Sequence, residues 1–513
     1  MSQDNHFLGI RFSKERLAWY LYDGGTSVVA LLAMVMFVPV YLLSTAEYAA
    51  WGPSLLEDCA SNGSSYPCRE CIPDKGWFAK VSADSRSILE ERSVNVLGFS
   101  ITSGAFPTVV VTVSTVLQAI MYITVGGLAD RGSSRKLGLI VASVIGQMAM
   151  LGFFLPLAPD SYMIAAALVI IANCANGVSF VYYNAYLPLL VDADERVLVA
   201  PDVEKASVRE FFQNRMSSYG FAAAYASSLI LAIGGVVIQV VTGGSSSSDG
   251  FFVDRLCIAM HGIWWLILSV PAYFWLKTRP GLPFEGSTLS ICFSGWVEAY
   301  RVLKEATRYP QTFIFLLCYF FYSDTISTIA LVGVLFAKEV LCMRNDEMAL
   351  VLVEILVFAM VGNIVYLKIY KRWSLEPKTL ITWILCVYSG LCLWGCLGYF
   401  NFSPIGFKSK WELHLFAAIH GLHTGSLQSF SRTLFADLIP PGKEGQFFSL
   451  YQITDKGGSW LGPLAITIIK QTTHSLRPGF FFLFLLTTGS TVLFSSLLDH
   501  RKGIQDAGRA DKS

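Results

Sequence analysis

The sequence predicts an all-α membrane protein with twelve transmembrane helices in two six-helix bundles, and three observations support this fold class. The 513-residue chain is 54% hydrophobic and 15% charged, whereas soluble domains carry roughly 25% charged residues. Apolar runs long enough to cross a bilayer recur along the whole chain. A polar stretch containing Pro and Gly divides these runs into two sets of six.

The twelve predicted helices follow these runs in order. In the first half the runs lie near residues 24–44, 101–128, 137–157, 161–190, 219–241 and 256–276. In the second half they lie near residues 311–337, 347–367, 379–400, 412–436, 447–469 and 479–498. The chain is therefore expected to divide into a segment 1–23, an N-terminal bundle 24–276 with a long first loop 45–98, a linker 277–310, a C-terminal bundle 311–498 and a tail 499–513.

Positively charged residues indicate which side of the membrane each loop faces. If both termini are cytosolic, the cytosolic segments hold most of the 38 Lys and Arg residues of the chain. Short cytosolic loops of membrane proteins carry an excess of Lys and Arg, and long translocated loops are exempt from this rule. We therefore expect cytosolic termini, a cytosolic linker and a luminal loop 45–98.

The two ends of the chain carry no further membrane signal. Arg11, Lys14 and Arg16 precede an apolar run that is too long for the core of a cleavable signal peptide, so the first helix is expected to anchor the chain. The tail 499–513 is polar and charged, a composition typical of disorder. We expect a disordered cytosolic tail.

The predicted luminal loop contains residues that an oxidising compartment would modify. Cys59, Cys68 and Cys71 are candidates for one disulfide. The sequence "NGS" makes Asn62 a candidate for glycosylation. The spacing of Cys68 and Cys71 matches half of a zinc site, but the sequence shows no second half, so no metal site is expected.

The loop between the second and third predicted helices reads "GGLADRGSSRK". Paired glycines permit close helix packing, an aspartate can face the N-terminus of a neighbouring helix, and basic residues can lock a cytosolic gate. The predicted gate residues here are Gly127, Asp130, Arg131, Arg135 and Lys136. The alternative is a basic loop that only sets the topology.

This loop resembles the signature loop of the major facilitator superfamily, and two six-helix bundles joined by a cytosolic linker resemble its fold. The resemblance implies that the halves are related by an axis along the membrane normal. It also implies a substrate path between the halves. The loop after the eighth helix, over residues 362–378, is basic and adds support to the topology only.

Polar residues lie deep in the fourth predicted helix, in "NCANGVSFVYYNAYLPLLV". Buried amides need hydrogen-bond partners whether they bridge helices or line a cavity. Both interpretations stay open for Asn173, Asn176, Tyr183 and Asn184.

The tenth and eleventh helices carry a more specific resemblance. "LQSFSRTLFADLIPPGKEG" and "FFSLYQITDKGGSWLGP" are similar to the autophagy-related protein 22-like family, as are "VYYNAYLPLL", "SSYGFAAAYASS" and "RLAWYLYD". The resemblance covers nearly the whole chain apart from loops. It implies a vacuolar or lysosomal membrane and the export of neutral amino acids to the cytosol. After Asp23 this chain reads "GGTSVV", where many relatives differ, and this leaves the substrate open.

Asp455 and Lys456 lie side by side in the eleventh predicted helix. Charged residues at membrane depth mark functional sites. Adjacent helical residues point about 100 degrees apart, so we expect each to find a different partner rather than each other. One interpretation has them holding this helix against the second helix and the Asp130 loop, as part of the gate. The other is direct contact with a zwitterionic substrate.

Further polar residues complete the predicted substrate path. A carboxylate in a transport helix can carry a proton, or can form a salt bridge across the bundle. His420 and His423 are spaced to share a helix face, which more often serves packing than metal binding. The substrate-path candidates are Asp23, Asn173, Asn176, Tyr183, Asn184, Asp324, Glu354, Gln428 and Arg432.

These features together predict a secondary transporter that works by alternating access. The sequence contains no phosphate-binding loop of the G-x-x-x-x-G-K type and no G-x-S-x-G nucleophile elbow, so neither an enzyme nor a cofactor is expected. Expected partners are membrane lipids, amino acids and protons, without nucleic acid. The alternatives are a transporter of another small organic solute and a non-transporting receptor with the same fold.

Overall fold

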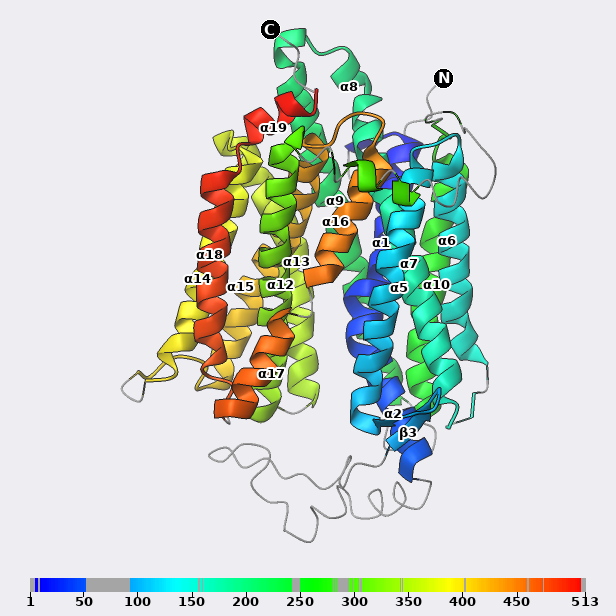
Figure 1. Ribbon diagram of the computed structural model, residues 1–513, viewed down its shortest axis with the longest axis vertical. Coiled ribbons are helices and arrows are strands. Elements are labelled where there is room, and N and C mark those ends of the chain that lie inside the picture. Colours follow the sequence, from blue (N-terminus) through cyan, green and yellow to red (C-terminus); the bar gives the residue numbers. More distant parts are fainter. Residues whose placement is uncertain are drawn as a thin grey trace.

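Two groups of long, nearly parallel helices stand side by side in the computed structural model (Figure 1). The structure describes residues 5–7, 10–51, 93–241, 250–283 and 295–508, apart from a few single positions and the pairs 305–306, 401–402 and 459–460 within these ranges. The predicted sites Asn62, Cys59, Cys68 and Cys71 lie outside the described residues.

The N-terminal group contains six spans. Helix α1 (Lys14–Val28), the π-helical segment η1 (Val29–Phe37) and α2 (Val38–Trp51) follow one another without a break and make the first span. The others are α5 (Phe106–Ala129), α6 (Ser134–Leu151), α7 (Tyr162–Asp192), α9 (Asp202–Val241) and α10 (Gly250–Trp275). Short elements at the ends are η2 (Ser103–Ala105), η3 (Gly152–Phe154) and α8 (Glu195–Leu198).

The C-terminal group repeats this number of spans. Its helices are α12 (Pro310–Glu339), α13 (Asn345–Trp373), α14 (Pro377–Leu397), α15 (Lys410–Asp437), α16 (Glu444–Gly458), α17 (Leu461–Thr473) and α18 (Gly479–Leu497), followed by the short α19 (His500–Asp506). Each predicted apolar run coincides with one of these spans. The prediction of an all-α membrane protein with two bundles is therefore confirmed.

Ten of the described helices are long and apolar enough to cross a membrane by themselves. The two remaining predicted spans, the tenth and the eleventh, are present but do not meet this criterion of length and hydropathy. Helix α15 has full length but carries many polar residues, and the eleventh span is described as two shorter helices, α16 and α17, on either side of the undescribed residues 459–460. The polar content of α15 reflects its contacts with the other half, described below.

The eleventh span is described in two parts, α16 up to Gly458 and α17 from Leu461, and residues 459–460 between them lie outside the described residues. Glycine is a poor helix former, so the pair Gly457 and Gly458 is a weak point in this span. A side chain at Gly458 would come within 2.9 Å of the backbone oxygen of Phe320 on α12. The glycine thus permits close contact between α16 and α12.

Two helices begin earlier than their apolar runs suggested. Helix α1 starts at Lys14 rather than near residue 24, with the side chain of Ser13 accepting a hydrogen bond from the Arg16 N–H as an N-cap. Helix α9 starts at Asp202 rather than near residue 219. Its first four turns are polar, and hydropathy alone assigned them to a cytosolic loop.

Two small antiparallel hairpins were not predicted. Strands β1 (Asn5–Phe7) and β2 (Ile10–Phe12) form one, and β3 (Ser93–Val96) and β4 (Phe99–Thr102) form the other. The second hairpin turns at Leu97 and Gly98, both with positive φ. It occupies residues 99–102, so the second span begins at the helical turn η2 instead of Ile101.

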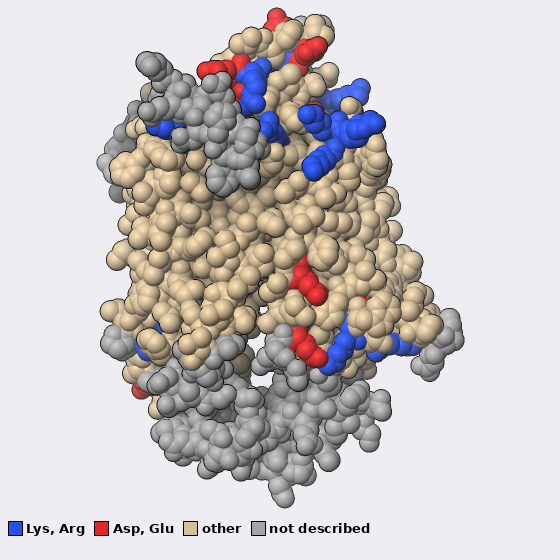
Figure 2. Space-filling model, turned by 180° about the vertical axis from the view of Figure 1, so that it is seen from behind, with Lys and Arg blue, Asp and Glu red and all other residues tan. Residues whose placement is uncertain are grey.

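The last described helix, α19, lies at the end of the molecule opposite β3, and we call this end the termini end (Figure 1). Figure 2 shows that nearly all charged side chains on one face lie near the two ends, with an uncharged band between them. Such a band is what a bilayer core requires.

The tail is partly ordered, contrary to the expectation of disorder. Residues His500–Asp506 form α19, which Asp499 caps through a hydrogen bond from the Lys502 N–H at 3.1 Å. The N–H of Asp499 donates to Gln311 on α12 at 2.7 Å. The absent side chain of Gly503 allows α19 to lie against Leu438.

Each half has its own apolar core. Buried side chains of α12, α14, α15, α16 and α18 form one cluster, and those of the N-terminal helices form two others. Only a few residues join a cluster of the other half, among them Ala185, Leu356 and Ala359. The apolar clusters therefore lie mostly within one half or the other, and the contacts between the halves are of a different, polar kind.

Candidate functional site: polar contacts between the two halves

Asp130 lies at the end of α5 and faces the start of α16 in the other half. Its carboxylate accepts hydrogen bonds from the N–H groups of Gly445 at 2.7 Å and Gln446 at 2.9 Å. Arg135 donates to the same carboxylate at 2.9 Å, and it lies 3.5 Å from Glu444. An aspartate at this position satisfies free N–H groups and the positive end of the helix dipole. The contact joins the halves at the termini end.

Glycines allow α5 and α16 to approach this closely. A side chain at Gly445 would come within 2.5 Å of the Ala129 Cβ, and one at Gly126 would collide with Ser449. The predicted gate residue Gly127 is also buried, whereas Arg131 and Lys136 are half-buried. Of the predicted loop residues, Asp130 and Arg135 therefore make the described contacts across the interface.

Burial affects the ionisation of Asp130, which lies just outside the membrane span. Removal from water raises the pKa of Asp130 to about 7, against the lowering effect of Arg135 and of the two N–H groups of α16. Glu444 adds to the rise. The contact is therefore sensitive to pH near neutrality.

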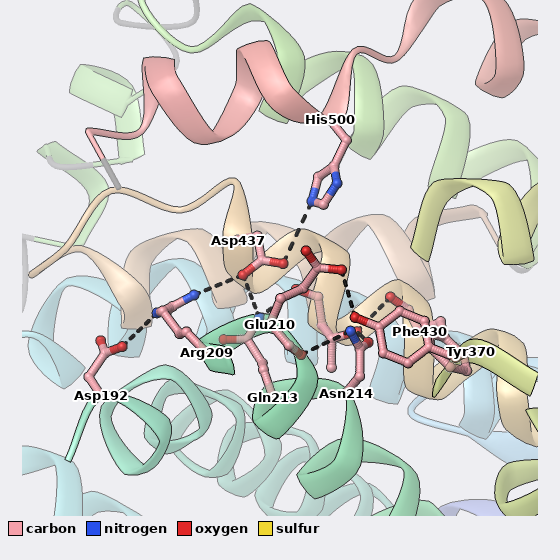
Figure 3. Close-up of polar contacts among 10 residues, drawn as sticks. Asp192, Arg209, Glu210, Gln213, Asn214, Tyr370, Phe430, Asp437 and His500 are labelled. Carbon is pink, nitrogen blue, oxygen red and sulfur yellow. Dashed lines mark hydrogen bonds and ion pairs between the residues drawn. The ribbon is translucent and has the colours of Figure 1, made fainter. Parts of the chain in front are cut away.

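A second set of contacts joins α9 to α15 (Figure 3). Arg209 lies 2.9 Å from Asp437, Gln213 donates to the Thr433 carbonyl at 2.9 Å, and Ser217 donates to the Ser429 carbonyl at 2.9 Å. The two helices run in opposite directions, so steps of four residues up α9 match steps of four residues down α15. The contacts form a polar ladder between the halves, and we use that name below.

Other side chains strengthen the end of the ladder. Arg209 also lies 2.6 Å from Asp192 at the end of α7. Tyr370 of α13 donates to Glu210 at 2.8 Å. His500 of α19 lies 3.6 Å from Asp437, so the tail helix reaches the same carboxylate as Arg209 (Figure 3).

The sequence analysis missed the polar ladder. Its α9 members lie in the stretch that charge and hydropathy assigned to a cytosolic loop. A usable signal was present, because Arg209, Gln213 and Ser217 recur every fourth residue, which places them on one helix face. On α15 the residues Ser429, Thr433 and Asp437 show the same spacing.

A third set of contacts lies deeper and centres on Arg432 of α15. Its Nε donates to the Ser217 hydroxyl at 2.9 Å and its Nη2 to the Ser217 carbonyl at 3.1 Å. Its Nη1 lies 3.3 Å from Asp23 and 3.5 Å from Asn184. Four predicted substrate-path residues, counting the nearby Tyr183, are thus brought together.

The remaining polar candidates of the fourth and tenth helices take other positions. Asn176 donates to the Thr26 carbonyl at 3.0 Å, within the N-terminal half. Asn173 donates to the Ser114 hydroxyl at 2.8 Å, also within that half. These two amides bridge helices. Gln428 accepts a hydrogen bond from Tyr225 at 2.9 Å and therefore joins the halves.

The expected separation of Asp455 and Lys456 is wrong. The Lys456 Nζ lies 3.6 Å from the Asp455 carboxylate, because a long lysine side chain can fold back toward its neighbour near the end of α16. Asp455 accepts hydrogen bonds from Tyr319 and Ser323 of α12, both at 2.8 Å. These hydrogen bonds lie inside the C-terminal half, so they do not hold α16 against α5 as the gate interpretation supposed.

The other deep charges also have partners within the C-terminal half. Asp324 of α12 accepts hydrogen bonds from the N–H of Gly462, at 3.0 and 3.2 Å, at the start of α17. Glu354 lies 2.8 Å from His414, and both are partly exposed. Tyr388 contacts His420 at 3.2 Å. Among the described residues no group of three His, Cys, Asp or Glu is placed to hold a metal ion.

The three sets of contacts lie between the termini end and the middle of the molecule. Each joins a helix of one half to a helix of the other, and each contains buried charge. If the halves part at this end, these contacts must break. The arrangement can therefore serve as a gate that is closed in this structure.

Proteins with similar sequences are found among fungi. The chain is 30% identical to "Autophagy-related protein 22" of Coccidioides immitis, over 92% of this chain and 84% of that protein. It is 28% identical to "Autophagy-related protein 22-1" of Neosartorya fischeri, over 96% and 91%.

Solved structures and a family model agree with this architecture. The human organic anion transporter MFSD10 superposes with a TM-score of 0.59 at 12% identity, over 94% of this chain and 99% of that one. The proton:xylose symporter XylE gives the same TM-score and identity, over 96% and 97%. These likenesses show the fold of major facilitator superfamily transporters. The family model described as "Vacuole effluxer Atg22 like" matches residues 12–508. The chain therefore belongs to the Atg22-like vacuole effluxer family, a multi-pass membrane transporter family and not a family of enzymes.

Proposed function

We propose that this protein exports neutral amino acids from a vacuole or lysosome-like compartment to the cytosol by alternating access. The observation that carries the proposal is the buried Arg432, which extends from α15 into the other half and contacts Asp23 and Ser217. Charged groups this deep are costly unless they serve a path or a switch. The compartment and the direction follow the description of the family as vacuole effluxers.

The gate contacts explain how two states could alternate. Asp130, the polar ladder and Arg432 hold the termini end closed, and the charge distribution assigns that end to the cytosol. In this state the substrate would enter from the lumen. Release requires the halves to part at the termini end. The polar groups that make the buried contacts between the halves then become hydrated.

The test is release of a labelled solute from sealed vesicles that contain the purified full-length protein. One set of vesicles holds a mixed pool of neutral amino acids, and parallel sets hold a sugar or an organic anion. Each set is measured with and without a pH gradient, which tests proton coupling. Vesicles without protein give the background.

We expect release of amino acids above background, with little release of the other solutes. Preferential release of the sugar or the organic anion would replace amino acids with another solute class. Folded protein that releases none of them would favour the receptor alternative.

A further inference from the structure

Arg432 places all of its described polar contacts on the opposite half. It belongs to α15, yet its hydrogen-bond partners Asp23, Asn184 and Ser217 belong to α1, α7 and α9. Both charged groups are almost fully buried, with 2% of Arg432 and none of Asp23 exposed. The ion pair of Arg432 and Asp23 therefore exists only while the two halves are in contact at the depth of these residues.

Aromatic rings surround the guanidinium group. Its central carbon lies 4.4 Å from the ring centre of Phe221, 5.0 Å from that of Trp19 and 5.6 Å from that of Tyr183. Trp19 and Tyr183 stack at 4.5 Å. Cations bind favourably over such faces, and the rings exclude water, which strengthens any charge interaction inside.

One more polar group lies at this place. The hydroxyl of Tyr183 is buried and interacts with both Asp23 and Arg432, although neither contact has the geometry of a standard hydrogen bond. The Tyr183 ring lies beside both Trp19 and Arg432. A ligand that reached Asp23 and Arg432 would therefore also reach this hydroxyl, whose hydrogen-bonding capacity is not fully used.

Opening of the termini end would separate Asp23 from Arg432. Removing one partner from a buried ion pair is strongly unfavourable, because each charge then lacks compensation. A solute can favour the open state only if it binds that state more tightly. A zwitterion does so, since its carboxylate can take the place of Asp23 on Arg432 and its ammonium can take the place of Arg432 on Asp23.

We propose that Asp23 and Arg432 form a subsite for the two charged ends of an α-amino acid, which replaces their own ion pair as the gate opens. This subsite rests on the proposed function, since it names the groups that would recognise the amino acid. Arg432 receives the carboxylate and Asp23 the ammonium. Trp19 and Phe221 offer an apolar surface to the side chain, which suits a neutral amino acid such as leucine.

The experiment measures competition against labelled leucine in sealed vesicles that contain the wild-type protein. The competitors are unlabelled leucine, 4-methylpentanoate, which lacks the ammonium, and 3-methylbutylamine, which lacks the carboxylate. We expect each single-charge analogue to compete at least about tenfold more weakly than leucine, because a hydrogen-bonded buried charge is left unpaired. Competition by either analogue within about threefold of leucine would overturn the subsite.

Two variants assign the ends, and a third is a matched control. Asp23→Asn should lose preference for the ammonium, so that 4-methylpentanoate approaches leucine as a competitor. Arg432→Gln should do the same for 3-methylbutylamine. The control is Tyr22→Phe, which keeps the ring stacked on Tyr183 and removes the hydroxyl that lies 2.6 Å from that of Ser143. It should keep the wild-type preference.

The possible failures are distinguishable. Wild-type protein that transports no amino acid would remove the proposed function and the subsite together. Wild-type protein that transports leucine, with both variants folded and unchanged in preference, would remove the subsite alone. If neither variant folds, the competition series on the wild-type protein still decides, because it needs no substitution.

Discussion

Two buried aspartates in this protein receive N–H groups from the first turn of a helix, but they differ in which helix they cap. Asp130 of α5 accepts from Gly445 and Gln446 of α16, in the opposite half. Asp324 of α12 accepts from Gly462 of α17, in its own half. Both carboxylates accept N–H groups near the start of a helix. Only the Asp130 contact breaks, however, if the two halves move apart as rigid bodies. Location across the interface, and not burial or charge, marks a gate residue.

The largest expected effect comes from removing each carboxylate. Asp130→Ala should cost the closed state up to about 3–5 kcal/mol, because Arg135 keeps only Glu444 at 3.5 Å and two N–H groups of α16 lose their acceptor. Asp324→Ala should cost about 1–3 kcal/mol in every state, since it leaves an N–H without an acceptor. A cysteine at Ser449, which lies against Gly126, reports opening through its reaction with a membrane-impermeant maleimide.

Labelling should rise in Asp130→Ala and stay at the wild-type level in Asp324→Ala, while the thermal stability of Asp324→Ala falls. The same proteins without the cysteine give the background from native thiols. Equal labelling of the two variants would show that an aspartate contact between the halves affects opening no more than an aspartate contact within one half.

The polar ladder should show a similar contrast with a smaller effect. Gln213→Leu removes hydrogen bonds to the Thr433 carbonyl and to Asp437, and should weaken closure by about 1–3 kcal/mol. Gln147→Leu is the matched control, because this buried glutamine bonds Tyr273 within the N-terminal half. Maleimide labelling should rise only in the first variant. A rise in both would point to general loosening of the fold.

Closure should depend on the pH at the termini end. Burial raises the pKa of Asp130 from 3.8 to about 7, so the closed state takes up a proton that an open, hydrated Asp130 would release. Burial alone would lower the pKa of His500, but its contact with Asp437 raises that pKa above 6.5. The charged His500 therefore stabilises its contact with Asp437 at low pH and loses this effect as pH rises through the raised pKa.

The contact between His500 and Asp437 lies within the C-terminal half, so the closure effect is expected from Asp130, and acid favours closure. Asp130 can change the equilibrium by up to about tenfold per pH unit between its open-state pKa and about 7. Maleimide labelling should rise with pH up to about 7, with a shallower slope in Asp130→Asn and an unchanged slope in His500→Gln. A slope that Asp130→Asn leaves unchanged would assign the pH dependence to other groups.

The smallest effect is expected for Glu354, a predicted proton carrier. Its carboxylate lies 2.8 Å from His414, but the two side chains are 26% and 33% exposed. The pair lies within the C-terminal half, so its loss breaks no contact between the halves, and a glutamine at this position can still accept a hydrogen bond from His414. Glu354→Gln should therefore leave both thermal stability and solute release close to wild type. Loss of pH-driven release in this variant alone would restore Glu354 as the proton carrier.

The sequence predicted the fold well, because hydropathy records which residues face lipid. It placed all twelve spans, and it predicted that Asp130 would face a helix N-terminus. It failed where polar residues are buried between the halves: hydropathy assigned Arg209 and Gln213 to a loop, although their spacing with Ser217 was helical. One of its two interpretations placed Asp455 in the gate, because sequence alone cannot tell which neighbouring helix a deep charge faces.

The central claim is that the halves must part at the termini end during transport, and a reversible crosslink tests it most directly. The hydroxyl oxygens of Ser218 on α9 and Ser429 on α15 lie 3.1 Å apart across the halves. Those of Thr26 on α1 and Ser179 on α7 lie 3.3 Å apart within one half. Cysteines at either pair are near enough to form a disulfide after small adjustments.

Release from vesicles is measured for both double-cysteine variants after oxidation and again after reduction. The account predicts that oxidation stops release through the Ser218→Cys/Ser429→Cys protein and that reduction restores it, while the Thr26→Cys/Ser179→Cys protein keeps releasing solute. Unchanged release through the fully crosslinked Ser218→Cys/Ser429→Cys protein would contradict the account.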